Sequence, residues 1–330
     1  MTIVFHERYL DHMQYRGHPE RPERLMTVVR KMIDLDLWKD VLKPEAATES
    51  DLLLVHTKDH VETIRNADEG FLDPDTYIRN ETFEIALLAA GGAIAAANYA
   101  FFHRKPVLAL LRPPGHHAGK NFCGGFCYFN NVAIAAKRLS LNRLAIVDLD
   151  VHHGNGTENV FYADRSVLFI SLHQYGIYPC SGAAEDVGVG EGEGFNINIP
   201  LGSGSGDGTY FYAFEKIVQP LMLQFKPEAL LVSLGIDAHH KDPLASMKLS
   251  SYGYVELCRR LIQISPDSRI AFMLEGGYDL EATADVLSAL VAQFQVKKIP
   301  LRHEQMTDLE IVGKRFVDNV VNVQRKYWDL

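Results

Sequence analysis

The segment from residue 144 to residue 156 constrains the fold of this chain more than any other. It begins with four apolar residues at 144–147, a pattern that predicts a buried strand. Asp148, Asp150 and His152 follow, and alternate residues of a strand share one face. Burying carboxylates and an imidazole is costly, and a bound metal ion is the usual compensation. Oxygen and nitrogen donors without cysteine favour Zn²⁺ or a similar first-row ion in an open, catalytic site.

The remaining apolar runs alternate with segments of helical pattern. The four main runs cover residues 107–111, 167–171, 229–234 and 270–274. Near-continuous apolar strands that alternate with helices indicate a parallel sheet with helices on both faces. We therefore predict a three-layer αβα fold with a mainly parallel sheet. We also expect a short strand at 52–55 and a long, Ala-rich core helix over 81–102.

The chain contains 330 residues, of which 47% are hydrophobic, enough for a sizeable core. Its composition does not change along the sequence, and it contains no internal repeat. We predict a single domain over residues 1–330, with a motif-bearing core at about 1–295 and a C-terminal helical extension at 296–330.

Reactive side chains follow the ends of the predicted strands. His116 and His117 come after the first main run, Asp237 after the third and Tyr278 after the fourth. Ligands of parallel sheets bind outside the carboxyl ends of the strands, so these residues should converge on one site. Asp237 is the best third metal ligand, because it is a lone carboxylate at a strand end beside glycine. The competing residues, better interpreted as a polar rim, are His239, His240 and Asp242.

The same site offers partners for the paired histidines and walls for a substrate. Asp148, which is not needed as a third ligand, can orient one imidazole, and Asn155 can hold the other. An amide carries no charge, so the histidine that it holds is less easily protonated. The phenol of Tyr278 could hydrogen-bond an oxyanion opposite the metal. Phe126 and Tyr178 would supply apolar walls.

Charge and cysteine content narrow the function classes. The formal net charge of −9 argues against nonspecific binding to nucleic acid or to anionic membranes. Four cysteines are too few for a disulfide scaffold in a chain of this length. The first residues do not have the pattern of a signal peptide. We expect a soluble, cytoplasmic protein without a membrane span.

Six motifs resemble, in order and spacing, the zinc-dependent histone deacetylase superfamily, which also includes acetoin-utilization proteins and acetylpolyamine amidohydrolases. The motifs are Arg112-Pro-Pro-Gly-His-His-Ala, Gly125-Phe-Cys-Tyr-Phe-Asn-Asn, Asp148-Leu-Asp-Val-His-His-Gly-Asn-Gly, Ser171-Leu-His, Gly235-Ile-Asp and Leu274-Glu-Gly-Gly-Tyr. The resemblance runs from His18 to about Phe294. Asn155 and the Leu274 motif look closer to class II deacetylases and their prokaryotic relatives than to class I.

This resemblance implies an arginase/deacetylase-like fold and a role for each site residue. It implies one Zn²⁺ on Asp150, His152 and Asp237. It also implies His117 as general base, His116 paired with Asp148 as its electrostatic partner, and Tyr278 as carbonyl polariser. The implied substrate contacts are Gly125, Phe126, Tyr178, Leu244 and Gly276. The implied ligands of a structural K⁺ are Asp148, Asp150, His152, Ser171 and Leu172.

The implied reaction is removal of acetyl groups from lysine side chains of proteins by attack of metal-activated water. The first alternative is the same chemistry on acetylated polyamines or other small acylated amines. Polyamine-specific relatives carry an acid at the pocket mouth, where this chain has Leu244, which weakens that alternative. Asp73 and Asp75, in a turn-rich loop, could grip a substrate backbone or an amine.

Two further alternatives come from other classes. A dimanganese, ureohydrolase-like enzyme would need a second carboxylate pair after Gly235-Ile-Asp, and Ala-His-His follows there instead. A metal stoichiometry of two per chain would support it. A non-enzymatic ligand-binding protein is disfavoured by the complete set of metal ligands, paired histidines and tyrosine. The sequence leaves open the physiological substrate, the metal used in the cell and assembly into a homo-oligomer.

Overall fold

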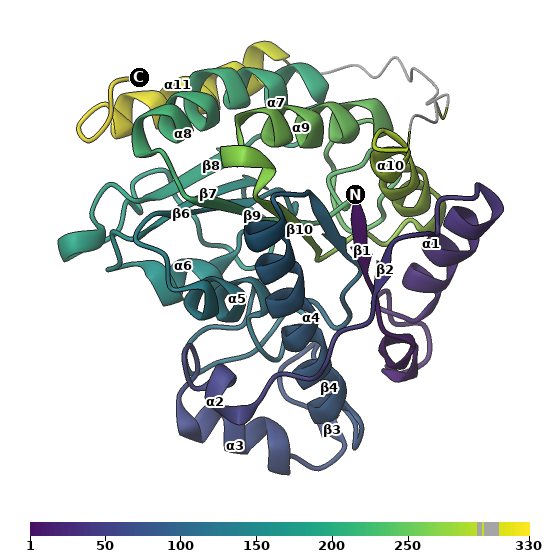
Figure 1. Ribbon diagram of the computed structural model, residues 1–330. Coiled ribbons are helices and arrows are strands. Elements are labelled where there is room, and N and C mark those ends of the chain that lie inside the picture. The colour runs from purple at the N-terminus through teal and green to yellow at the C-terminus, as the bar shows by residue number, and fades with distance from the viewer. Residues whose placement is uncertain (296–298, 300–309) are drawn as a thin grey trace.

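A parallel sheet of eight strands forms the centre of the computed structural model, which describes residues 1–295, 299 and 310–330 (Figure 1). The strand order is β2-β1-β5-β10-β9-β6-β7-β8. These strands are β1 (Thr2–Val4), β2 (Val41–Leu42), β5 (Val107–Ala109), β6 (Leu144–Asp148), β7 (Val167–Gln174), β8 (Asn196–Leu201), β9 (Ala229–Leu234) and β10 (Ile270–Leu274). A separate antiparallel pair consists of β3 (Gly70–Phe71) and β4 (Tyr77–Ile78).

Helices cover both faces of the sheet, which confirms the predicted three-layer fold (Figure 1). On one face lie α4 (Thr82–His103), α5 (Asn131–Leu139) and α6 (Asn155–Phe161). On the other face lie α1 (Glu23–Asp34), α7 (Asp207–Ala213), α8 (Gln219–Phe225), α9 (Ser251–Ile264), α10 (Leu280–Ala292) and α11 (Glu310–Gln324). The small helices α2 (Glu49–Leu52) and α3 (Lys58–Asn66) lie at the same end of the molecule as the β3–β4 pair (Figure 1).

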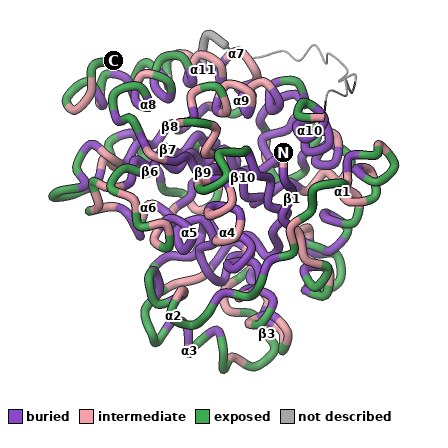
Figure 2. Tube along the Cα trace, in the orientation of Figure 1, coloured by how far each residue is buried: buried purple, intermediate pink, exposed green. Residues whose placement is uncertain are grey.

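Every residue of the five strands β5, β6, β7, β9 and β10 is buried (Figure 2). Their apolar side chains belong to one continuous core, because helices cover the sheet on both faces. Burial on both faces explains why these strands read as apolar runs rather than as an alternating pattern. The long helix α4 packs against β5, β10 and α5. It has the length and hydropathy of a membrane span, but 61% of its most apolar 18-residue window is buried inside the molecule.

The expected strand at 52–55 is wrong. Residues 49–52 form α2, which begins with a capping box between Thr48 and Asp51. Leu52 and Val55 are buried, whereas Leu53 and Leu54 are each more than 40% exposed. An apolar pair three residues apart fits a helical turn and not a strand, where neighbours alternate.

The C-terminal part contains the predicted helix. Residues 310–324 form α11, which packs against β8 and α7. Residues 296–298 and 300–309, also assigned to this extension, lie outside the described residues.

Candidate active site

A cavity of about 280 Å³ opens at the carboxyl ends of the central strands. The three predicted metal ligands and the paired histidines come from loops after β6, β9 and β5. The predicted site residues that line this cavity are His116, His117, Gly125, Phe126, His152, Tyr178, Leu244, Gly276 and Tyr278. The adjacent order of β5, β10, β9 and β6 in the sheet is what brings them together.

Asp150, His152 and Asp237 meet next to the cavity, which His152 lines. One donor atom from each lies within 4.8 Å of the others. His152 Nδ1 lies 3.1 Å from Asp150 Oδ1 and 3.2 Å from Asp237 Oδ2. Burial, and then the charge of Asp150, raise the pKa of Asp237 to about 7. Two buried carboxylates and an imidazole converging on one point fit a divalent cation, which would remove the repulsion between the carboxylates.

Two glycines allow the carboxylates to approach the backbone. A Cβ added at Gly235 would lie 2.2 Å from Asp150 Oδ2, and one added at Gly276 would lie 2.2 Å from Asp237 Oδ2. The N–H of Gly276 also donates to Asp150 Oδ2 at 2.8 Å. Side chains at either position would therefore displace these two carboxylates.

The paired histidines have different partners. His116 Nδ1 lies 3.0 Å from Asp148 Oδ2, and His117 Nδ1 lies 2.7 Å from Asn155 Oδ1. Burial lowers the pKa of His116, but the charges of Asp150 and Asp148 outweigh it and raise that pKa to about 10. Burial, followed by the neighbouring His116, holds the pKa of His117 well below 6.5. One imidazole is therefore held as a cation beside a second that is held neutral.

Asp242 and Arg24 hold Tyr278 and the loop that carries it in place. Asp242 Oδ2 accepts a hydrogen bond from the N–H of Tyr278 at 2.7 Å. The guanidinium of Arg24 lies over the Tyr278 ring, 4.9 Å from its centroid, and its Nε donates to the carbonyl of Gly277 at 2.7 Å. Burial raises the pKa of Tyr278 well above 10, so the phenol stays protonated and can donate a hydrogen bond.

Aromatic rings form the walls of the cavity. Phe126 contacts the rings of His18 and Tyr278 edge to face. Tyr178 contacts the ring of His117 at a centroid distance of 4.9 Å. Gly125 has a φ of +54°, and a Cβ there would lie 2.3 Å from His117. These contacts make a narrow slot above the histidine pair.

The mouth of the cavity is more exposed. Leu244 and Tyr178 are about 40% exposed. Asp75 also lines the cavity, and its backbone carbonyl lies 3.2 Å from His18 Nε2. Asp73 accepts hydrogen bonds from the N–H groups of Asp75 and Thr76, so it shapes the loop.

The remaining polar residues of these motifs have structural partners. His153, which follows His152, lies 2.8 Å from the Ser181 hydroxyl and 3.3 Å from Glu158. Ser171, assigned with Leu172 to a potassium site, pairs in register with Asp148 across β6 and β7. Its hydroxyl lies 2.9 Å from His173 Nδ1.

Sequence reasoning assigned no role to a buried ionic network behind Tyr278. Its members are His12, Glu20, Arg24, Arg112 and Glu275, all fully or almost fully buried. Arg24 donates to the carbonyl of Glu275 at 2.5 Å and pairs with Glu20 at 3.4 Å. The signal available was the dense charge in His18-Pro-Glu-Arg-Pro-Glu-Arg, since buried charges are kept where they pair. Tyr15 and His18, which line the cavity, come from the same N-terminal segment.

The comparisons with known proteins agree with this geometry. Residues 18–294 match the family described as the histone deacetylase domain. The chain belongs to the histone deacetylase family.

Similarity to members of this deacetylase family extends over almost the whole chain. A probable deacetylase from Archaeoglobus fulgidus is 38% identical, covering 99% of this chain and 98% of its own. Histone deacetylase 15 from Arabidopsis thaliana is 35% identical over 99% of this chain, which spans 62% of that protein. The crystal structure of the HDA15 HD domain matches with a TM-score of 0.90 at 33% identity, covering 99% of this chain and 97% of that one. The chain is accordingly a deacetylase-type hydrolase that acts on amide bonds.

Proposed function

We propose that this deacetylase is a zinc enzyme that removes acetyl groups from lysine side chains of proteins. The observation that carries the proposal is the convergence of Asp150, His152 and Asp237 beneath a narrow aromatic slot. A slot walled by Phe126 and Tyr178 suits an extended aliphatic chain that ends in an amide.

Zn²⁺ held by Asp150, His152 and Asp237 would supply Lewis-acid chemistry toward the scissile carbonyl and toward water. His117, kept neutral by its pKa, accepts the proton of the attacking water. His116 carries positive charge beside it, stabilised by Asp148. The hydroxyl of Tyr278 donates a hydrogen bond to the oxygen that becomes negative. The imidazolium formed on His117 then returns a proton to the leaving amine.

The same family signature supports one alternative substrate class, small acylated amines. Asp75 at the mouth could pair with a distal ammonium group. Leu244, which also lines the cavity, offers no charge. The dimanganese alternative lacks support, because Asp242 accepts hydrogen bonds from the N–H groups of Tyr278 and Asp279.

The deciding experiment is hydrolysis of a fluorogenic acetyl-lysine peptide, with and without a zinc-chelating hydroxamate. Tyr278→Phe should lower kcat by about 10²–10³-fold. Tyr175→Phe is the matched control, because Tyr175 is 63% exposed. Faster turnover of N-acetylputrescine than of the peptide would overturn the lysine assignment. Turnover that survives complete removal of zinc would overturn the metal assignment.

We also propose a structural K⁺ where the end of β6 pairs with the middle of β7. Its support is the pairing of Asp148 with Ser171, which brings oxygen-bearing residues of two neighbouring strands together. Bound K⁺ would stabilise the folded state by mass action. Tm should therefore rise with KCl relative to equal ionic strength of a bulky organic chloride, and equal Tm values would refute the site.

A further inference from the structure

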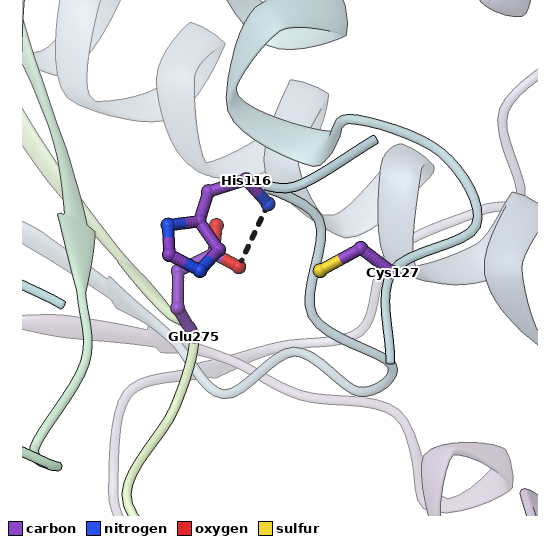
Figure 3. Close-up of side chains that lie close together, drawn as sticks. All are labelled: His116, Cys127 and Glu275. Carbon is purple, nitrogen blue, oxygen red and sulfur yellow. Dashed lines mark hydrogen bonds between the residues drawn. The ribbon is translucent and has the colours of Figure 1, made fainter. Parts of the chain in front are cut away.

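A second cluster of metal-ligand side chains lies next to the histidine pair (Figure 3). His116, Cys127 and Glu275 each offer one donor atom, and the three atoms lie within 4.8 Å of one another. The residues are all buried and come from separate segments: the loop after β5, the loop before α5 and the residue after β10. Figure 3 shows the sulfur and the carboxylate both turned toward the imidazole.

The hydrogen bonds of Glu275 leave one oxygen without a partner. Its Oε2 accepts from the N–H groups of Gly115 and His116, at 2.6 and 3.2 Å. Its Oε1 is buried and has no hydrogen-bond partner among the residues that the structure describes. A buried carboxylate oxygen in this state is uncommon and calls for a ligand.

The other two donors can also reach an ion. His116 uses Nδ1 for Asp148, so Nε2 is its remaining donor atom; it lies 3.6 Å from Asp150 Oδ1 and must lose its proton to bind an ion. The thiol of Cys127 makes a weak hydrogen bond to the carbonyl of Gly125 at 3.3 Å. His116 lines the active-site cavity, so an ion can approach the cluster from that side.

We propose that His116 Nε2, Cys127 Sγ and a Glu275 oxygen form a second metal site, selective for Zn²⁺ or Cd²⁺, whose occupation inhibits the enzyme. One sulfur, one nitrogen and one oxygen are donors that Zn²⁺ accepts, and the sulfur favours the softer Cd²⁺ over Mn²⁺. This preference separates the site from the dimanganese alternative, which would take up Mn²⁺.

Charge balance permits the ion at this depth. Binding displaces the thiol proton of Cys127, the carboxyl proton of Glu275 and the imidazolium proton on His116 Nε2, and no group is oxidised or reduced. Thiolate and carboxylate together offset both charges of the ion. Burial raises the pKa of Glu275 to about 7 and that of Cys127 well above 9, so affinity should increase with pH.

Inhibition follows from the position of His116. Its ring lies 3.9 Å from that of His117, centroid to centroid. An ion on Nε2 would replace the imidazolium that stands beside the general base. Only this loss of turnover depends on the proposed function, because binding can be measured without it.

The test uses enzyme that carries one equivalent of Zn²⁺, in a Cys123→Ser/Cys180→Ser background that removes the two partly exposed thiols. Cd²⁺ is added at increasing concentration. Bound metal is measured by equilibrium dialysis, thiolate-to-cadmium charge transfer by ultraviolet absorption, and turnover with the acetyl-lysine peptide. We expect a second ion, the absorption band and the loss of turnover to appear together. Cd²⁺ that merely exchanges into the first site would give no band, because that site has no sulfur.

Two variants decide whether Cys127 is the ligand. Cys127→Ser should lower the affinity for the second ion at least tenfold. It should also relieve inhibition, measured relative to the basal rate of the same variant. Cys258→Ser, which removes another buried thiol in α9, should behave as the parent. Unchanged affinity for the second ion in Cys127→Ser, or full occupancy of the second site without inhibition, would overturn the proposal. If the peptide is not turned over at all, the proposed function fails, whereas dialysis and absorption still decide the site.

Discussion

His117 Nδ1 lies 2.7 Å from Asn155 Oδ1, so the imidazole that faces the cavity donates its proton to an uncharged amide. Its neighbour His116 pairs with the carboxylate of Asp148. The charges of Asp150 and Asp148 raise the pKa of His116, whereas burial and the neighbouring His116 lower that of His117, so two adjacent rings of the same type differ in protonation state.

Asn155→Asp should move the acid limb of the pH profile upward. A carboxylate beside His117 favours the imidazolium and raises the low pKa of this group. Because the base must be neutral to act, the acid limb of kcat/KM should shift to higher pH by about one unit or more. Asn159→Asp, on the exposed side of the same helix, should leave the limb in place. A limb that does not move in Asn155→Asp would exclude His117 as the base.

Arg24→Lys should lower kcat about tenfold or more while KM changes little. The guanidinium holds the carbonyls of Glu275 and Gly277 and covers the Tyr278 ring, and a lysine cannot make all three contacts. Arg24 acts through Tyr278 as a positioning residue. The check is steady-state kinetics beside urea unfolding, with Arg30→Lys on the exposed side of α1 as control. If Arg24 acts only through Tyr278, the double variant Arg24→Lys/Tyr278→Phe should lose no more kcat than Tyr278→Phe alone. Additive losses of kcat would contradict this role.

Gly276→Ala should weaken zinc binding by about 10–100-fold, as loss of a supporting contact around ligands commonly does. The new Cβ would meet Asp237 and Asp150, and neither carboxylate can move without leaving the cluster. Competition with a chromophoric chelator measures the affinity. Gly70→Ala is the control, because that position is open and its φ is not positive. Wild-type affinity in Gly276→Ala would mean that the three proposed ligands do not hold the metal.

Leu244→Glu should increase kcat/KM for N-acetylputrescine relative to an acetyl-lysine peptide. A carboxylate at the cavity mouth can pair with the distal ammonium, and an exposed pair of this kind contributes about 0.2–1 kcal/mol, or up to about fivefold. Leu223→Glu, on the exposed face of α8, should not change the ratio. The increase should diminish at high salt, and a ratio insensitive to both mutation and salt would show that the amine does not reach the mouth.

The sequence was informative where local pattern determines position. Apolar runs predicted the central strands, and strand ends predicted that Asp150, Asp237 and Tyr278 would meet, because parallel strands end at one edge. The run at 52–55 misled because four apolar residues do not distinguish a short strand from a helical turn.

The support around the site was not predictable in the same way. Arg24 contacts Gly277 across more than 250 residues of sequence, and Glu275 reaches Gly115 across 160. Neither pair produces a periodic pattern or a motif spacing in the sequence, because both contacts form only when α1 and the loop after β5 pack beside β10. The choice between Asp148 and Asn155 as partner of each histidine likewise depended on resemblance, because both lie in one short segment.

The position of α11 gives the chain a folding boundary that differs from its family boundary. The match to the histone deacetylase domain ends at residue 294, yet Val317 and Val320 of α11 are fully buried in the core that includes β8. Each buried valine contributes about 1.5–3 kcal/mol, a large share of the stability of an ordinary domain. A fragment cut where the motifs stop would keep every predicted site residue and expose the apolar surface of β8, which α11 covers. The shortest fragment that folds is therefore determined by the packing of α11 on β8 and not by the positions of the site residues.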